Sequence, residues 1–111
     1  MIFSGDIACP NLDQLPIINM PNDLRHKVWV SNLEGAIELD QNKYIQEMVV
    51  FNNYEAIKEI KKNFNLQGLG LANNHITDTS SIIETKKNLD DLEIKYFGAG
   101  ETIAKAKKHA L

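Results

Sequence analysis

The chain has 111 residues, 43% of them hydrophobic, and a formal net charge of −3, so it can form one domain, or part of one, around a small core. The negative charge gives no electrostatic basis for binding nucleic acid or an anionic membrane surface. The single cysteine, Cys9, excludes an internal disulfide and a cysteine-based zinc finger, and we expect a plain reduced thiol rather than a metal ligand. No signal peptide and no membrane-spanning segment is recognisable, so the sequence as it stands predicts a cytoplasmic protein.

The first half of the chain predicts two strands separated by a loop. Met1–Gly5 is a short apolar run, and the tryptophan and valines of Lys27–Ser31 are typical of a buried strand. Between them, Cys9–Asp23 holds all three prolines and predicts a loop with one short helical turn. Gly35–Gln46 is a polar segment, and Met48–Phe51 is either a short strand or the approach to a helix.

The second half predicts three helices that alternate with two strands. Asn52 and Glu55 have the spacing of a capping box at the start of the first helix, and Ser81 and Glu84 have the same spacing in the second. In chain order the expected elements are a helix after Asn52, a strand over Gln67–Ala72, a helix over Asp78–Asp91, a strand over Ile94–Phe97 and a helix from Thr102 to Ala110.

This alternation favours an α/β fold with mainly parallel strands and right-handed crossovers. The last predicted helix reaches the final residues without a turn or a capping glycine, which indicates an incomplete domain over residues 1–111. Such a partial sheet would leave an edge strand and an apolar face exposed, and self-association through that edge is one consequence to expect.

Polar residues follow three of the predicted strands. Asp6 follows the first, Asn32 and Glu34 follow the second, and Asn73-Asn74-His75 follows the third. Because ligands of a parallel α/β sheet bind beyond the carboxyl ends of its strands, these side chains predict one shared site. Carboxylates, a carboxamide oxygen and an imidazole suit a divalent ion such as Mn, Fe, Zn or Mg, and two such ions can polarise a phosphoryl group and generate a hydroxide. His75 would contact the phosphoryl oxygens or protonate a leaving group.

Each of these residues also has a simpler interpretation. An aspartate after a strand is commonly a turn former or a helix cap, Asn73 and Asn74 are ordinary turn residues, and His75 is a common loop residue. Asp78 is expected to be a helix N-cap. Gly98–Gly100 predicts a tight turn rather than a phosphate cradle. An acid pair of a glycosidase type, formed by Asp6 and Glu34, is a further alternative, and it would make His75 dispensable.

Several short motifs, taken together, resemble the CapA-type capsule and poly-gamma-glutamate synthesis proteins, a family similar to the calcineurin-like metallophosphoesterases. In order, they are Gly5-Asp6-Ile7, Asn32-Leu33-Glu34-Gly35, Leu71-Ala72-Asn73-Asn74-His75 with Asp78, Thr85, Leu89 and Tyr96-Phe97-Gly98-Ala99-Gly100. The resemblance covers nearly the whole chain but only the amino-terminal part of the family's domain. It implies a partial metallophosphoesterase-like α/β sandwich.

The resemblance also implies roles for individual residues. Asp6 matches the first metal-binding aspartate, Glu34 the acidic metal-bridging position, and Asn74 a metal ligand. His75 matches the phosphate-contacting, catalytic histidine. Asn32 and Asn73 flank these motifs and are expected to contact the substrate, which the family implies is an anionic polymer or a phosphoester.

The chain departs from the family pattern in ways that limit this assignment. The later histidine motifs that complete the metal shell are absent, since the only histidine after His75 is His109, and His26 matches no motif. Members of the family are often membrane-associated or secreted, whereas no such segment is recognisable here. We therefore expect weak metal binding and no activity from this chain alone. A non-catalytic binding or assembly component of polymer synthesis or export is the alternative.

Overall fold

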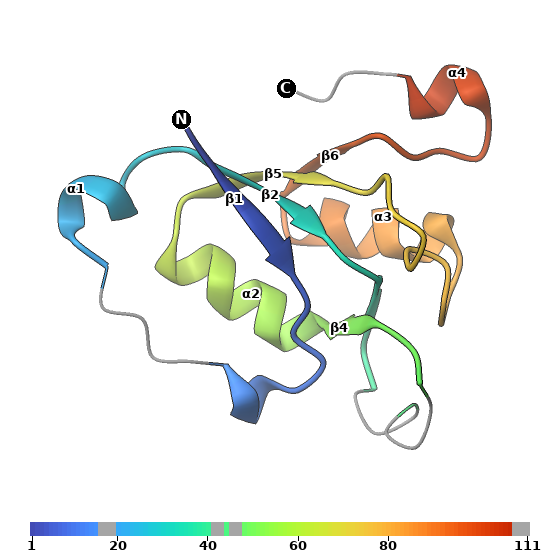
Figure 1. The fold of residues 1–111 in the computed structure, drawn as a ribbon, viewed down its shortest axis with the longest axis horizontal. Coiled ribbons are helices and arrows are strands. Elements are labelled where there is room, and N and C mark those ends of the chain that lie inside the picture. Colours follow the sequence, from blue (N-terminus) through green and yellow to red (C-terminus); the bar gives the residue numbers. More distant parts are fainter. Residues whose placement is uncertain (16–19, 41–43, 45–47, 108–111) are drawn as a thin grey trace.

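The computed structural model describes residues 1–15, 20–40, 44 and 48–107. Four strands form a parallel sheet in the order β1-β2-β5-β6, and two more form a small parallel pair, β3-β4 (Figure 1). The strands are β1 (Ile2–Ile7), β2 (Trp29–Leu33), β3 (Ala36–Glu38), β4 (Phe51–Asn53), β5 (Leu66–Gly70) and β6 (Lys95–Phe97). The helices are the 3-10 turn η1 (Leu12–Gln14), α1 (Asn22–Arg25), α2 (Tyr54–Asn63), α3 (Ile82–Asp91) and α4 (Ile103–Ala106). The predicted α/β fold with parallel strands is confirmed.

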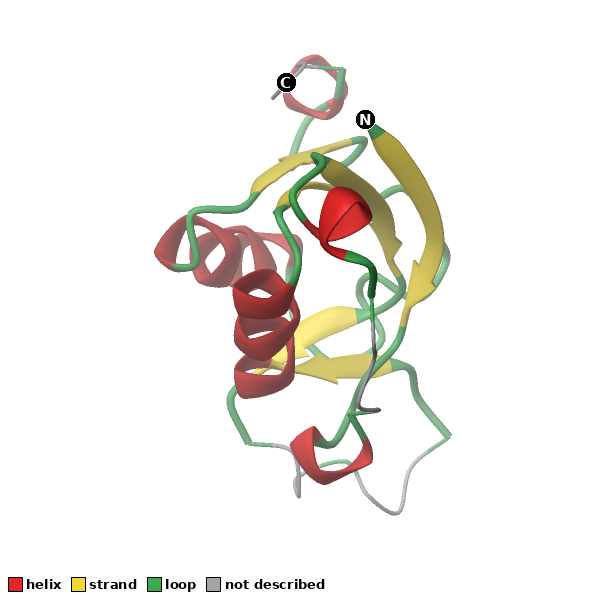
Figure 2. Ribbon diagram, turned by 90° about the vertical axis from the view of Figure 1, so that its left-hand side faces the viewer, coloured by secondary structure: helices red, strands yellow, loops and turns green. Residues whose placement is uncertain are grey.

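The two longer helices, α2 and α3, lie on the same side of the four-stranded sheet (Figure 2). Phe3 of β1 is 76% exposed and is not part of the buried core. Among the described strands, β1 pairs only with β2 and is therefore an edge strand. None of the helices in the described ranges has the length and hydrophobicity needed to cross a bilayer.

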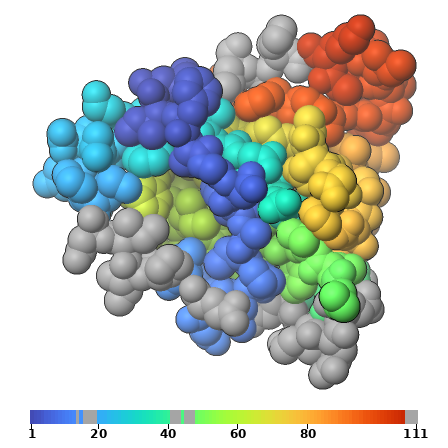
Figure 3. Space-filling view, viewed as in Figure 1, coloured from blue at the N-terminus to red at the C-terminus, as the bar shows by residue number. Residues whose placement is uncertain are grey.

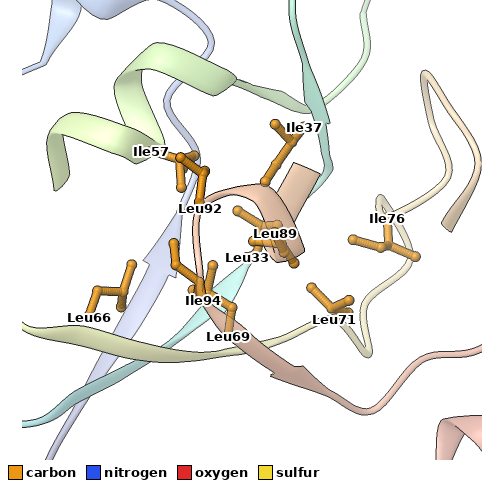
Figure 4. Packing of buried hydrophobic residues seen from close by; sticks show 10 residues of the cluster. All are labelled: Leu33, Ile37, Ile57, Leu66, Leu69, Leu71, Ile76, Leu89, Leu92 and Ile94. Carbon is orange, nitrogen blue, oxygen red and sulfur yellow. The ribbon is translucent and has the colours of Figure 1, made fainter. Parts of the chain in front are cut away.

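The hydrophobic core fills the space between the sheet and these helices (Figure 4). Its ten buried members come from both sheets, from α2 and α3 and from the segments that follow β5 and α3: Leu33, Ile37, Ile57, Leu66, Leu69, Leu71, Ile76, Leu89, Leu92 and Ile94. Thr85 of α3 is also fully buried, and its hydroxyl accepts a hydrogen bond from the Ile37 amide at 3.2 Å, which attaches β3 to α3. The core therefore lies on the face of the sheet that α2 and α3 cover (Figure 2).

Two strands extend further than the sequence predicts. β1 continues to Ile7 and β2 to Leu33, so Asp6 and Asn32 lie inside strands rather than beyond them. The segment predicted to be simply polar contains β3, because Ala36 and Ile37 are buried against the core.

The helix starts differ from the predictions by one to four residues. The N-cap of α2 is Asn53, whose Oδ1 accepts a hydrogen bond from the Ala56 amide at 3.2 Å, so the prediction that Asn52 caps this helix is wrong. The N-cap of α3 is Ser81, which accepts from the Glu84 amide as its spacing predicts. Because α3 begins only after Ser81, Asp78 is not its cap. The last predicted helix is observed as α4, which ends at Ala106 with Lys107 as its C-cap; the predicted helical residues 108–110 lie outside the described ranges.

Candidate functional site

The carboxyl ends of β1, β2 and β5 lie next to one another. Asp6 is the partner of Asn32 in the β1–β2 register, and Asn32 is the partner of Gly70 in the β2–β5 register. Figure 3 shows the segments that follow these strands meeting on one face of the molecule, where blue, teal and yellow atoms adjoin. The predicted site residues are therefore brought to one edge of the sheet.

A chain of side-chain hydrogen bonds crosses the three strand ends. Asn32 Nδ2 donates to Asp6 Oδ1 at 2.8 Å, and Asn73 Nδ2 lies 3.4 Å from Asn32 Oδ1. Asn73 Oδ1 in turn accepts from the His75 amide at 3.1 Å. One continuous network thus links Asp6 on β1 to His75 after β5.

Asn73 also fixes the main chain around the site. Its Nδ2 donates to the Leu33 carbonyl at 2.7 Å, and its Oδ1 lies 3.5 Å from the Gly35 amide. A carboxamide with one donor and one acceptor group joins two loops in this way without introducing charge. Asn32 and Asn73 therefore serve the internal architecture of the site, and their contact with a substrate stays a prediction.

His75 pairs with Asp78, which lies three residues later in the sequence. His75 Nδ1 lies 2.8 Å from Asp78 Oδ2, and the same oxygen accepts from the Val50 amide at 3.1 Å. These hydrogen bonds, the one from Val50 first, lower the pKa of the Asp78 carboxyl. The sequence interpretation of Asp78 as a cap missed this role, for which the His-x-x-Asp spacing was the available signal.

Glu34 and Asn74 complete the set of predicted residues. The Glu34 amide donates to the Ile7 carbonyl at 3.0 Å, which places Glu34 beside the end of β1. Asn74 is exposed, and its Nδ2 lies 3.3 Å from His75 Nε2, so its Oδ1 is the atom left as a ligand.

Asn52 is a structural residue of the site that sequence reasoning assigned to another role. It is fully buried, its Oδ1 accepts from the Cys9 amide at 2.7 Å and its Nδ2 donates to the Glu34 carbonyl at 2.8 Å. This single side chain connects the segment after β1 to the segment after β2, beside the start of α2. No local sequence pattern signals such a contact between distant segments.

A family model described as bacterial capsule synthesis protein PGA_cap matches residues 22–111. The chain belongs to this family. The match includes Glu34, Asn74 and His75, whereas Asp6 lies before its first residue. No curated protein and no solved structure matches the chain.

The chemical type of the donor atoms at the strand ends of this capsule synthesis protein limits which metal ions they could bind. Within residues 1–15, 20–40, 44 and 48–107, no three His, Cys, Asp or Glu side chains come together as a metal-holding group. A metal site formed by the predicted residues would therefore have at most two carboxylates, those of Asp6 and Glu34, with the Asn74 carboxamide oxygen and water. Such hard oxygen donors suit Mg²⁺ or Mn²⁺ better than a soft, thiolate-preferring ion.

The contact between His75 and Asp78 leads to a prediction for the pKa of the Asp78 carboxyl. Because the folded-state pKa of Asp78 is depressed, the pair contributes stability above the ordinary aspartate pKa, and this contribution is lost as the pH falls through the lowered value. In His75→Ala the Asp78 pKa should rise but remain below its ordinary value, because the Val50 amide still donates to the carboxylate. The titration of the Asp78 carboxyl carbon by NMR measures both values.

The control for this titration is His26→Ala, which removes an exposed histidine at the C-cap of α1. It should leave the Asp78 titration unchanged. A complete return of Asp78 to the ordinary aspartate value in His75→Ala would contradict the leading role of the Val50 amide.

Proposed function

We propose that this capsule synthesis protein binds a divalent metal ion at the carboxyl ends of β1, β2 and β5 and acts in hydrolysis of a phosphoester or related bond of an anionic polymer or its precursors. The observation that carries the proposal is the hydrogen-bond network that joins Asp6, Asn32, Asn73 and His75 across three strands. Networks of this kind orient ligands before a metal binds.

The residues of the chain would divide the work. Asn32 Nδ2 donates to Asp6 Oδ1, which orients the carboxylate. The other carboxylate oxygen, Oδ2, would then bind the metal ion. Asp6, Glu34 and the Asn74 Oδ1 would hold the metal ion. A bound divalent ion supplies Lewis-acid polarisation of the phosphoryl group and lowers the pKa of a coordinated water.

His75 would act on the phosphoryl oxygens or the leaving group. Its Nδ1 is engaged by the Asp78 carboxylate, which fixes the orientation of the ring. The remaining nitrogen, Nε2, would then face the substrate, with Asn74 beside it. A carboxylate that orients a histidine, which itself transfers the proton, is a common arrangement in acid–base catalysis.

Metal binding is the direct test of the proposal. We expect Asp6→Asn and Asn74→Ala each to weaken Mn²⁺ binding at least about tenfold in isothermal titration calorimetry, because each removes a ligand. The matched control is Asp23→Asn, which removes an exposed carboxylate of α1 far along the chain from the site. Equal weakening by Asp23→Asn would mean that Mn²⁺ responds only to net charge and would refute the site.

Turnover by the chain itself is expected to be absent. Asp6, Glu34 and Asn74 supply fewer donors than a two-metal centre needs. The 111-residue chain with Mn²⁺ should not hydrolyse bis(p-nitrophenyl) phosphate above the metal-only blank. Robust hydrolysis that is lost in His75→Ala would overturn the expected inactivity and support a complete catalytic site.

A non-catalytic binding or assembly role in polymer synthesis is the second candidate. It is favoured by the lack, in the part of the chain that the structure describes, of three converging acidic, histidine or cysteine side chains. Wild-type protein that binds no Mn²⁺ in the titration, while remaining folded by circular dichroism, would select this role.

A further inference from the structure

A cavity lies under β1, on the side of the sheet that α2 covers. It has a volume of about 660 Å³, within the range of about 300–1,000 Å³ typical of small-molecule sites. Figure 2 shows the sheet and α2 as separate layers, with α1 at their side, and all three elements contribute to the lining. Of the proposed metal ligands only Asp6 lines it, whereas Glu34, Asn74 and His75 do not, so the cavity adjoins the proposed metal site and extends away from it.

Most of the lining is apolar. Trp29 of β2, Ile60 of α2 and Phe64 after α2 form one wall, and the rings of Trp29 and Phe64 meet edge to face at 5.8 Å. On the sheet side, the hydroxyls of Ser4 and Ser31 are hydrogen-bonded to each other. The wall therefore offers a ligand apolar contact and leaves few polar groups to satisfy.

Arg25 is the exception at the α1 end of the cavity. Its Nε is buried and has no hydrogen-bond partner among the residues that the structure describes. A buried guanidinium N–H without an acceptor is unfavourable, and a carboxylate is a favourable acceptor for a guanidinium group. Asp6 lines the cavity too, at the end of β1, and its negative charge disfavours a ligand carboxylate there. The charges therefore direct an anionic group towards α1.

We propose that this cavity binds a small carboxylate with an apolar body, with the carboxylate on Arg25 and the apolar part against Trp29, Ile60 and Phe64. The proposed ligand contacts do not use the residues assigned to the hydrolase chemistry, although Asp6 borders both sites. The chemical class follows from one cationic donor at the α1 end of a mostly apolar cavity.

The chain carries two built-in reporters for this cavity. Trp29 is its one tryptophan and Cys9 its one cysteine, and both line the cavity. Burial raises the pKa of the Cys9 thiol, so its alkylation is slow and sensitive to further covering. Decanoate should shift the Trp29 emission and slow the alkylation of Cys9 by iodoacetamide in the same concentration range.

The probe pair decanoate and decanol separates anion recognition from simple apolar binding. We expect wild-type protein to bind decanoate about tenfold more tightly than decanol, because only decanoate pairs with Arg25. Arg25→Leu should remove this preference, and Arg25→Lys should keep part of it. The control Lys27→Leu removes an exposed cation two residues away and should leave the preference intact.

The outcomes are decisive even if Arg25→Leu is poorly folded, since the wild-type comparison needs no variant. Equal affinity of decanoate and decanol for the wild-type protein would overturn the proposal. So would loss of the preference in Lys27→Leu as well as in Arg25→Leu, or decanoate binding that leaves Cys9 alkylation unchanged.

Discussion

Replacing Asn52 by leucine should lower the free energy of unfolding by about 3 kcal/mol, because two buried backbone groups lose their hydrogen-bond partner. The Cys9 amide and the Glu34 carbonyl are bound to the Asn52 side chain at 2.7 and 2.8 Å, and Asn52 is fully buried, so water cannot replace it. Leucine has nearly the same shape, and the loss therefore reports the hydrogen bonds rather than a cavity. Urea unfolding followed by circular dichroism measures it.

The neighbouring position provides the control. Asn53→Ser keeps a side-chain oxygen at the N-cap of α2 and should change the stability by less than about 0.5 kcal/mol. If Asn53→Ser destabilised the protein as much as Asn52→Leu, the effect would belong to the β4–α2 junction in general and not to the link that Asn52 makes.

Replacing Gly35 by alanine should also cost about 3 kcal/mol. Gly35 has φ of 88°, a conformation that disfavours any side chain, and an added Cβ would lie 2.6 Å from the Val50 carbonyl carbon and 2.9 Å from the Phe51 nitrogen. Neither neighbour is a flexible side chain, so the backbone between β2 and β3 would have to move. Because Glu34 precedes Gly35 directly, Mn²⁺ affinity should fall together with the unfolding free energy.

Gly5→Ala is the matched glycine control. A Cβ at Gly5 would meet no atom within 4 Å, and its backbone does not adopt a positive φ. We expect a change within about 0.5 kcal/mol. A loss of unfolding free energy in Gly5→Ala similar to that in Gly35→Ala would show that alanine at either position acts through the unfolded state. Close approach of the Cβ to Val50 and Phe51 would then not be the cause.

The sequence predicts those parts of the fold that depend on local pattern. The apolar runs before Asp6, Asn32 and Asn73 indicate strands, and Ser81 with Glu84 indicates the start of α3, because strand alternation and capping act over a few residues. The assembly of the three strand ends also follows from the sequence, since parallel strands place their carboxyl ends at one edge.

The parts that were missed depend on contacts between distant segments. Asn52 and Asn53 are the same residue type, and only the packing of the Cys9 and Glu34 segments decides which of them links these segments and which one caps α2. Asp78 has the composition of a cap, but its carboxylate is engaged by the Val50 amide, which lies 28 residues earlier in the chain. Such choices are made by tertiary structure and override local preference.

The position of β1 has a consequence for how firmly the site is assembled. This strand is bonded to β2 on one side, and its four central residues, among them Asp6, are exposed. Edge strands of this kind open locally at a lower free energy than the strands of the core, so the amides of β1 should exchange with solvent while those of β5 stay protected. Whenever β1 opens, Asp6 leaves the network although the rest of the molecule remains folded. The apparent metal affinity of the proposed site would therefore be the intrinsic affinity multiplied by the fraction of time that β1 is closed.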